Sequence, residues 1–442
     1  MAPVKVSLLV VGAGHAGVCA VEEFHRYAPR KHAALVDPDP DAFYFRAALK
    51  FFVKGELEGA KLAGRGAGWA KRNRATLVAD SVDSIDHDAR VATLGSGELV
   101  EYEKLVLATG AEPFVPPVEG SDLPGVLPFR SLGDARAIRE RASELNRERD
   151  RAPVAVVGAG VLGLELAEAL AKLGVPTTLI CDSDYLAPRL LDRGAARVVA
   201  ETFREHGVEV LFGERVKKIE RAGSTGLPVS PLWVTTESGR RFEASAAYFC
   251  TGVRPKVGLA KGAGFDVGRG VLVDDHMRAS APGAFAAGDC AELRGKDGEG
   301  GGLLQLWAPA GLMGRVAGRN AASEEGPRAR FSAGCVHVYT MLFDKPYHAL
   351  GEFAPGAKAP TRKPGQPVED DGELVEMVRP DSAPGDYFKM AYRGNRLVGV
   401  VALGEVHDPL VLKRAIEAGA EVPPGLRQAA LAVTFDYERL LY

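Results

Sequence analysis

The chain has 442 residues, of which 46% are hydrophobic, and a formal net charge of −3 at neutral pH. This length predicts two or three domains with buried cores, and the charge gives no case for nucleic-acid binding. No apolar run approaches the length of a membrane span, and the N-terminus enters a predicted strand at once, without room for a signal peptide.

Cysteine usage indicates the cellular compartment and argues against a metal site. The chain has five scattered cysteines, namely Cys19, Cys181, Cys250, Cys290 and Cys335. They form no C-x-x-C pair or His/Cys cluster, so we expect neither a zinc site nor an iron–sulfur cluster. Reduced thiols and the absent leader predict a cytoplasmic protein.

The first stretch with a chemical signature is VKVSLLVVGAGHAGV, residues 4–18. Its apolar run predicts a strand buried on both faces of a parallel sheet. Gly12, Gly14 and Gly17 follow with G-x-G-x-x-G spacing, and Asp37 ends the next apolar run. These residues would permit a tight turn, the approach of a pyrophosphate, close helix–strand packing and a hydrogen bond to a ribose, respectively. The stretch therefore predicts a dinucleotide-binding domain.

The next hundred residues predict elements with less specific signals. A short helix is expected over 43–54, with Arg46 and Lys50 among its polar residues. Short alternating stretches over 75–103 predict a meander that returns to the first sheet. Residues 133–150 are strongly charged and predict an exposed helix.

A second copy of the glycine pattern lies 146 residues after the first. The segment APVAVVGAGVLGLELAEALAKLG contains Gly158, Gly160 and Gly163, and Asp182 ends the following apolar run. Two such patterns, each between a predicted strand and a predicted helix, make a chance match improbable. The chain is therefore expected to bind two dinucleotides.

The fold class that follows is α/β, with two Rossmann-like dinucleotide-binding domains and a C-terminal α+β domain rich in short strands. We expect the first domain in two parts, 1–120 and 251–328. The second domain is expected over 121–250, and the C-terminal domain over 329–442.

Five segments occur in an order that resembles a known family: GAGHAG, LATG, GAGVLGLE, CTGVRP and AAGDCAE. The sequence resembles FAD-dependent pyridine nucleotide-disulphide oxidoreductases over nearly its whole length. It is most similar to members that lack the disulphide, such as ferredoxin and rubredoxin reductases, nitrite reductase flavoproteins and NADH oxidases. The resemblance implies FAD in the first domain and NADH, rather than NADPH, in the second.

The resemblance also implies roles for individual residues. Asp289 would bind the ribityl chain or phosphate region of FAD, and Val82 would contact adenine through its backbone. Lys50 and Glu165 are the expected catalytic residues; Glu165 would orient the nicotinamide carboxamide, or would otherwise be an ordinary helix carboxylate. The expected cofactor-binding residues are Gly12, Gly14, His15, Ala16, Asp37, Arg46, Lys50, Val82, Thr109, Gly110, Arg130, Gly158, Gly160, Val161, Leu162, Glu165, Asp182, Gly252, Gly288, Asp289, Trp307 and Ala308.

Two departures from the family pattern affect the expected chemistry. Disulphide-containing members carry C-x-x-x-x-C on the helix after the first ribose-binding acid, whereas FRAALKFFVKG contains no cysteine and has Ala47 or Ala48 near the expected position. Electrons should then leave directly from the flavin. The second departure is Cys181, which stands where the family usually has its ribose-binding acid. Asp182 follows it, and the absence of Arg or Lys from Thr177 to Pro188 favours NADH.

The predicted function is an NADH-dependent flavin reductase that passes electrons to a small carrier protein of the ferredoxin or rubredoxin type. An NADH oxidase or diaphorase that reduces oxygen or quinone is the alternative. A redox-sensing interaction protein that responds to NADH is an alternative from another class. The expected partners are a nicotinamide nucleotide and an electron carrier, with no nucleic acid, and the sequence leaves monomer and homodimer open.

Overall fold

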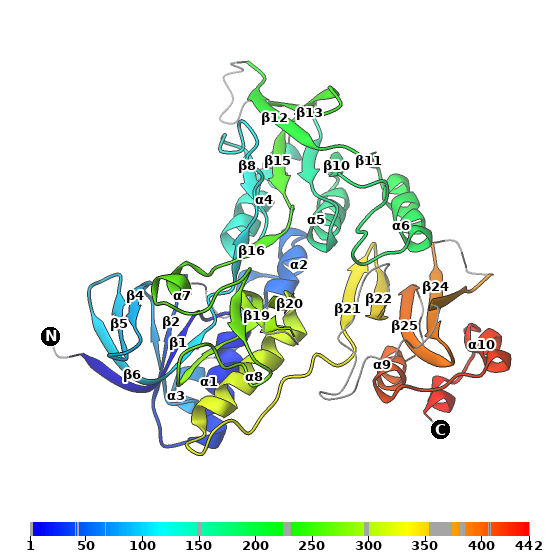
Figure 1. Cartoon of the computed structure of the whole chain (residues 1–442). Coiled ribbons are helices and arrows are strands. Elements are labelled where there is room, and N and C mark those ends of the chain that lie inside the picture. Colours follow the sequence, from blue (N-terminus) through cyan, green and yellow to red (C-terminus); the bar gives the residue numbers. More distant parts are fainter. Residues whose placement is uncertain are drawn as a thin grey trace. The chain divides into compact units, whose positions relative to one another are not determined.

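The computed structural model describes residues 3–39, 41, 44–66, 68–147, 152–223, 231–295, 300–352, 374–380, 383, 385–404, 406 and 408–441. The chain divides into two compact units (Figure 1). Unit 1 consists of Met1–Leu49, Leu57–Glu112 and Val253–Phe331. Unit 2 consists of Lys50–Glu56, Pro113–Gly252 and Ser332–Tyr442. The described helices include none with the length and apolarity needed to span a bilayer.

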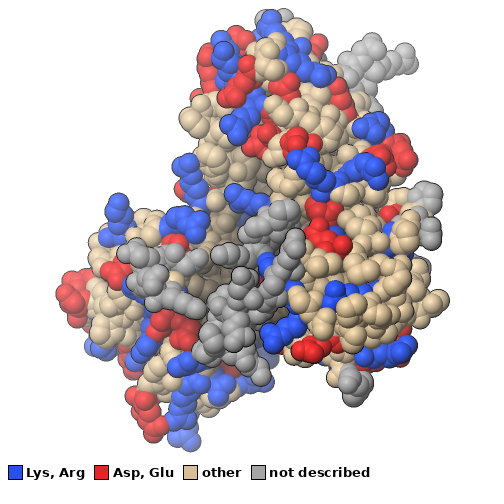
Figure 2. Space-filling view, turned by 45° about the vertical axis from the view of Figure 1, so that its right-hand side comes forward, with Lys and Arg blue, Asp and Glu red and all other residues tan. Residues whose placement is uncertain are grey.

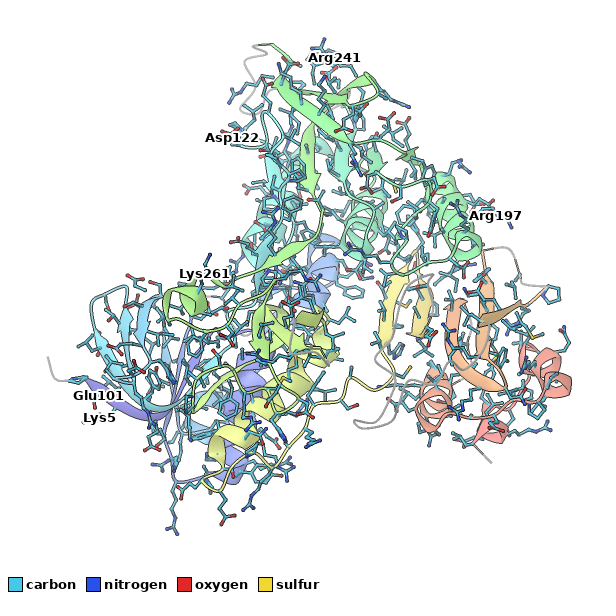
Figure 3. The ribbon with its side chains drawn as sticks, viewed as in Figure 1. Lys5, Glu101, Asp122, Arg197, Arg241 and Lys261 are labelled. Carbon is cyan, nitrogen blue, oxygen red and sulfur yellow. The ribbon has the colours of Figure 1, made fainter. Side chains whose placement is uncertain are left out.

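Unit 1 is built on a seven-stranded sheet in the order β3-β2-β1-β6-β5-β4, with β18 also paired to β6. Its strands are β1 (Val4–Val11), β2 (Ala33–Val36), β3 (Ala75–Val78), β4 (Val82–Asp86), β5 (Val91–Leu94), β6 (Leu99–Leu107) and β18 (Ala284–Ala286). The first strand is buried at its carboxyl end, as its apolar run predicts. Lys5 and Glu101 are partners in the β1–β6 register and form an ion pair of 2.6 Å (Figure 3).

The predicted meander over 75–103 is correct only in its second part. Strands β4, β5 and β6 are antiparallel neighbours, but β3 is a further parallel strand beside β2. Strand β3 has half-buried ends and two exposed central residues, a pattern that does not distinguish parallel from antiparallel pairing. The smaller sheet of unit 1 contains β17 (Val271–Val273), β19 (Ala291–Arg294) and β20 (Gly300–Leu303).

Two helices of unit 1, α1 (His15–Tyr27) and α8 (Trp307–Ala322), pack against each other along their lengths. A Cβ atom at Gly314 would lie 2.1 Å from the Ala16 carbonyl oxygen, and one at Gly318 would lie 2.1 Å from that of Ala20. The small residues of α8 therefore permit this close approach. The remaining helical elements of unit 1 are η1 (Arg46–Ala48), η2 (Gly59–Leu62), α3 (Trp69–Arg72), α7 (Gly258–Gly262) and η3 (Gly288–Cys290).

Unit 2 contains a second parallel sheet, in the order β11-β10-β9-β15-β8. Its strands are β8 (Val126–Pro128), β9 (Val154–Val157), β10 (Thr177–Cys181), β11 (Val208–Phe212) and β15 (Ala246–Phe249). Its helices are α4 (Leu132–Leu145), α5 (Val161–Lys172) and α6 (Arg193–Glu205), and β12 (Val216–Arg221), β13 (Leu232–Thr236) and β14 (Arg241–Ala244) form an antiparallel sheet. Two Rossmann-like sheets are therefore present, as predicted.

Two predicted helices need correction. The charged helix expected over 133–150 spans α4, with Leu132, Ile138 and Leu145 buried on one face, so the expectation of full exposure is wrong. Residues 148–150 lie outside the described residues. The helix expected over 43–54 consists of η1 followed by α2 (Leu49–Val53), and residue 43 also lies outside the described part.

The C-terminal part of unit 2 is an antiparallel sheet with helices, as predicted. It has the order β21-β22-β25-β24-β23, and buried residues of β24, β25 and α9 form much of its core. The elements are β21 (His337–Leu342), β22 (Lys345–Gly351), β23 (Leu374–Val378), β24 (Tyr387–Arg393), β25 (Arg396–Leu403), α9 (Pro409–Ala418), α10 (Pro424–Ala430) and η4 (Tyr437–Leu440). The boundaries expected at residues 120, 250 and 328 stay predictions.

The outer surface carries charge of both signs. On the face shown in Figure 2, basic and acidic side chains are intermingled.

Strand β7 (Ala111–Pro113) pairs with β16 (Val253–Pro255). Unit 1 includes all of β16 and the first two residues of β7, so this pair marks where the chain leaves and re-enters that unit.

Candidate functional site

The first glycine turn connects β1 to α1. Gly12 has φ = +108°, and a Cβ there would lie 2.2 Å from the Ala108 carbonyl oxygen. A Cβ at Gly17 would lie 1.9 Å from the Gly12 carbonyl oxygen, whereas one at Gly14 would meet nothing within 4 Å. The contacts of the chain therefore explain Gly12 and Gly17 but leave open space at Gly14. Such space suits a pyrophosphate that approaches the backbone at the start of a helix.

The second turn, between β9 and α5, has the same geometry. Gly158 has φ = +102°, and a Cβ at Gly163 would lie 1.8 Å from the Gly158 carbonyl oxygen. A Cβ at Gly160 again meets nothing within 4 Å. Val161 and Leu162 open α5 immediately after this turn. Both turns thus fit the nucleotides that the sequence predicts.

Asp37 lies beside the first turn. One of its carboxylate oxygens accepts a hydrogen bond of 2.6 Å from the Ala13 backbone N–H, and the other accepts one of 2.9 Å from Asp39. The strand order β2-β1 brings this acid to the carboxyl edge where the glycine turn begins. This position is the one that a ribose-binding acid requires.

The starts of α1 and α8 meet through aromatic rings. His15 stacks on Trp307 with a centroid distance of 4.0 Å, and Phe45 contacts Trp307 edge-on at 4.6 Å. Burial, together with the cations of Arg65 and Arg315, lowers the pKa of His15 to about 4. The imidazole is therefore neutral at physiological pH. Ala308 is exposed at the start of α8.

Other predicted residues of unit 1 occupy different places around the sheet. A Cβ at Gly288 would lie 2.8 Å from Ala16 Cβ, so these two predicted residues are adjacent, and Asp289 follows in η3. The Thr109 hydroxyl donates to the Lys256 carbonyl at 2.7 Å. Three more can be placed: Arg46 lies 3.3 Å from the Tyr44 hydroxyl, Val82 opens β4, and Gly110 has φ = +69°.

Two predicted residues of unit 2 lie outside its glycine turn. Arg130 immediately precedes the N-cap of α4, and its backbone N–H donates to Asp134 at 3.0 Å. Gly252 follows β15 with φ = +100°, and its carbonyl accepts from the Phe114 N–H at 2.9 Å.

The two expected catalytic residues meet in unit 2. The Lys50 ammonium lies 3.5 Å from a Glu165 carboxylate oxygen, with side chains only 3% and 13% exposed. Lys50 also donates to the Thr340 hydroxyl at 2.8 Å and to the Met341 carbonyl at 2.6 Å. The Thr340 hydroxyl donates in turn to Glu165 at 2.5 Å. Helices α2 and α5 and strand β21 therefore join in one buried polar cluster.

Burial determines the acidity of this cluster. It raises the pKa of Glu165, against the opposing effects of Lys50 and the Thr340 hydrogen bond. A buried acid with a raised pKa and a specific cationic partner is typical of functional sites. These observations favour a functional role for Glu165 over that of an ordinary helix carboxylate.

Sequence reasoning missed four members of this cluster. Glu168 is fully buried and lies 3.9 Å from Lys50, while Lys54 and Lys172 lie 3.6 and 3.7 Å from Glu168. The i,i+3 spacing of Glu165 and Glu168 and the i,i+4 spacing of Lys50 and Lys54 were usable signals. Thr340 was missed as well, and nothing in its local sequence indicates its role.

The stretch from Thr177 to Pro188 contains no Arg or Lys, but an arginine from elsewhere in unit 2 lies near Asp182. The Arg215 guanidinium lies 3.6 Å from the Asp182 carboxylate, although it is remote in sequence from β10, which ends just before Asp182. Both side chains are largely exposed. Cys181 is buried, so the residue at the usual acid position points away from solvent and Asp182 is the accessible one.

All five cysteines are buried and free. Burial raises the pKa of each thiol: Cys335 to about 12, and Cys19, Cys181, Cys250 and Cys290 above the ordinary cysteine value. Because the thiolate is the reactive form, these side chains are poor nucleophiles.

Two Rossmann-like sheets with matching glycine turns define a dinucleotide-dependent oxidoreductase of the flavoprotein class. Residues 6–314 match the family described as pyridine nucleotide-disulphide oxidoreductase, and the chain belongs to this family. It is therefore an FAD-dependent oxidoreductase that uses a nicotinamide nucleotide.

Individual relatives cover nearly the whole chain. Rhodocoxin reductase of Rhodococcus erythropolis is 31% identical over 96% of this chain and 92% of its own length. Subunit epsilon of the NADH-dependent phenylglyoxylate dehydrogenase of Aromatoleum evansii is 28% identical over 94% and 92%, respectively. The crystal structure of a ferredoxin reductase from Rhodopseudomonas palustris has the same fold, with a TM-score of 0.82 at 22% identity over 98% of this chain and 99% of that chain.

Proposed function

We propose that this protein is an NADH-dependent reductase that passes electrons from its flavin to a small carrier protein of the ferredoxin or rubredoxin type. The observation that carries the proposal is the state of the thiols. In a family named for disulphide chemistry, this chain has five buried cysteines with raised pKa values and none between Val21 and Ile180. Electrons that cannot pass through a thiol leave from the flavin itself. A carrier-protein reductase such as rhodocoxin reductase supports this acceptor class.

In this function, particular residues bind the two nucleotides and position the nicotinamide. The turns at Gly14 and Gly160 bind the pyrophosphates of FAD and NADH, and Asp37 binds the FAD ribose. When bound at the first turn, FAD would supply the acceptor for the nicotinamide hydride. Glu165 holds the nicotinamide carboxamide by accepting its N–H, and Lys50 opposes the rise in the pKa of Glu165 that burial causes.

An acceptor assay tests this function. The FAD-loaded protein is mixed with NADH and, in separate anaerobic reactions, with a ferredoxin, a rubredoxin or a quinone, and oxygen uptake is measured in air. We expect carrier reduction to exceed oxygen and quinone reduction by at least tenfold. Faster turnover with oxygen or quinone would favour the oxidase alternative. Absence of turnover with every acceptor, despite flavin reduction, would favour a redox sensor.

Thiol-directed reagents should have little effect on electron transfer. Alkylation of the accessible thiols is expected to leave NADH-to-dye activity within about twofold of the untreated value, because the thiolates are disfavoured by burial. Two-electron reduction by NADH should yield a flavin spectrum without a long-wavelength thiolate charge-transfer band. A Cys290→Ser variant that retains FAD but loses activity would contradict this prediction.

Nucleotide preference should depend on Asp182 and Arg215. The wild type should prefer NADH, because the Asp182 carboxylate repels a 2′-phosphate and occupies Arg215. Asp182→Asn should raise the NADPH/NADH ratio of kcat/KM on the order of tenfold, because it removes the repulsion and frees a guanidinium for phosphate. In the double variant with Arg215→Met, most of this gain should disappear. Equal kcat/KM values of the wild type for both nucleotides would contradict the preference.

A further inference from the structure

Glu168 is a buried carboxylate to which the proposed mechanism gives no role. Its side chain is 0% exposed, and Oε1 accepts a hydrogen bond of 3.2 Å from the Phe343 backbone N–H. The other oxygen, Oε2, has no hydrogen-bond donor in the described part of the chain. A buried carboxylate oxygen without a donor is costly. Each such group in a folded protein therefore needs an explanation.

The cation that faces this oxygen is Lys50, at 3.9 Å. An ammonium has three hydrogens, and Lys50 uses two of them on the Thr340 hydroxyl and the Met341 carbonyl. The third hydrogen has two competing acceptors: Glu165 Oε1 at 3.5 Å and Glu168 Oε2 at 3.9 Å. Both distances exceed the roughly 3.2 Å limit of a good N–H···O bond. Lys50 is therefore held firmly by neutral oxygens and only loosely by either carboxylate.

We propose that Glu168 is a positioning residue that takes over the third hydrogen bond of Lys50 when Glu165 turns to the nicotinamide carboxamide. This inference rests on the role of Glu165 in the proposed function. A shift of the ammonium by less than the length of a bond completes either contact. The exchange involves no proton transfer, because only the acceptor of the third Lys50 N–H changes. The exchange lowers the cost of releasing Glu165 to the nucleotide.

The charges around Glu168 are consistent with this role. Lys54 and Lys172 lie 3.6 and 3.7 Å from Oε1, and each has a second acidic neighbour, Glu56 and Asp344, respectively. These two lysines pair with Oε1, which leaves Oε2 toward Lys50. One oxygen of Glu168 is thus occupied, and the other has no donor among the described residues.

The test is a double-mutant cycle on the affinity for NAD⁺, measured by calorimetry on the FAD-loaded protein without turnover. Glu168→Gln should weaken NAD⁺ binding on the order of tenfold, the cost of a lost charge-assisted hydrogen bond. Glu165→Gln should also weaken binding. When Glu165→Gln is already present, adding Glu168→Gln should weaken NAD⁺ binding by less than about a further twofold. In that background Lys50 no longer pairs with a charged Glu165. Such coupling would not arise from a purely structural role.

Two further variants serve as controls for this measurement of NAD⁺ affinity. Glu209→Gln removes an exposed carboxylate of the same unit and should leave NAD⁺ affinity unchanged. Glu168→Asp retains the charge farther from Lys50 and should restore part of the affinity; it replaces Glu168→Gln in the cycle if that variant does not fold. Two results would overturn this inference and leave the proposed function standing. One is normal NAD⁺ affinity in the Glu168 variants, and the other is an equal loss of affinity with and without Glu165→Gln. Normal affinity in Glu165→Gln would overturn the assigned role of Glu165 and the inference with it.

Discussion

Replacing Lys50 by methionine should reduce NADH-dependent flavin reduction by about 100-fold or more in kcat/KM. Lys50 is 3% exposed and forms an ion pair of 3.5 Å with Glu165. Removal of one partner of a buried ion pair leaves an uncompensated charge at a cost of about 3–5 kcal/mol. Burial would then raise the pKa of Glu165 without the opposing effect of Lys50, and a protonated Glu165 accepts the carboxamide N–H less well. Stopped-flow reduction of the FAD-loaded variant measures the loss.

The pH dependence separates this cause from general damage. Burial already raises the pKa of Glu165, so KM for NADH in the wild type should rise as pH falls, starting above the usual glutamate range. Without Lys50 the opposing attraction is gone, and this rise should move to still higher pH. Lys54→Met, one turn away on the same face, is the control and should shift the profile much less, because Lys54 lies near Glu168 rather than Glu165. Identical profiles for both variants would refute the assignment.

A second large effect is expected from two glycines in one turn. Gly163→Ala should destabilise the protein by about 1–3 kcal/mol or more, because its Cβ would lie 1.8 Å from the Gly158 carbonyl oxygen. Gly160→Ala should leave the thermal unfolding midpoint within a few degrees, since its Cβ meets nothing within 4 Å. Its added methyl group should nevertheless reduce NAD⁺ affinity by at least tenfold, because it fills the space that the pyrophosphate needs.

Thermal unfolding and NAD⁺ calorimetry on the two variants check this contrast. The equivalent pair in unit 1 is Gly17→Ala and Gly14→Ala, read by unfolding and by FAD retention. An unstable Gly160→Ala protein would show that the fold, rather than a ligand, requires glycine there. Wild-type NAD⁺ affinity in a stable Gly160→Ala protein would rule out a pyrophosphate at this turn.

The sequence by itself determined the fold class and the two nucleotide turns. Strand burial, glycine spacing and the acid after the next strand are local features, and each is set by backbone geometry within about 25 residues. Lys50 and Glu165 belong to no such local pattern, and only the resemblance to the family indicated them. Local spacing could also have indicated Glu168 and Lys54, which lie one helical turn from residues that were already recognised.

Tertiary structure decided the rest. Thr340 contacts Glu165 from 175 residues away, and Arg215 contacts Asp182 from the connection between β11 and β12. The parallel pairing of Ala75–Val78 and the buried face of α4 likewise depend on which neighbours each element meets. Contacts between residues far apart in the chain leave no periodic pattern in the sequence, because only packing and charge pairing in the folded protein bring them together.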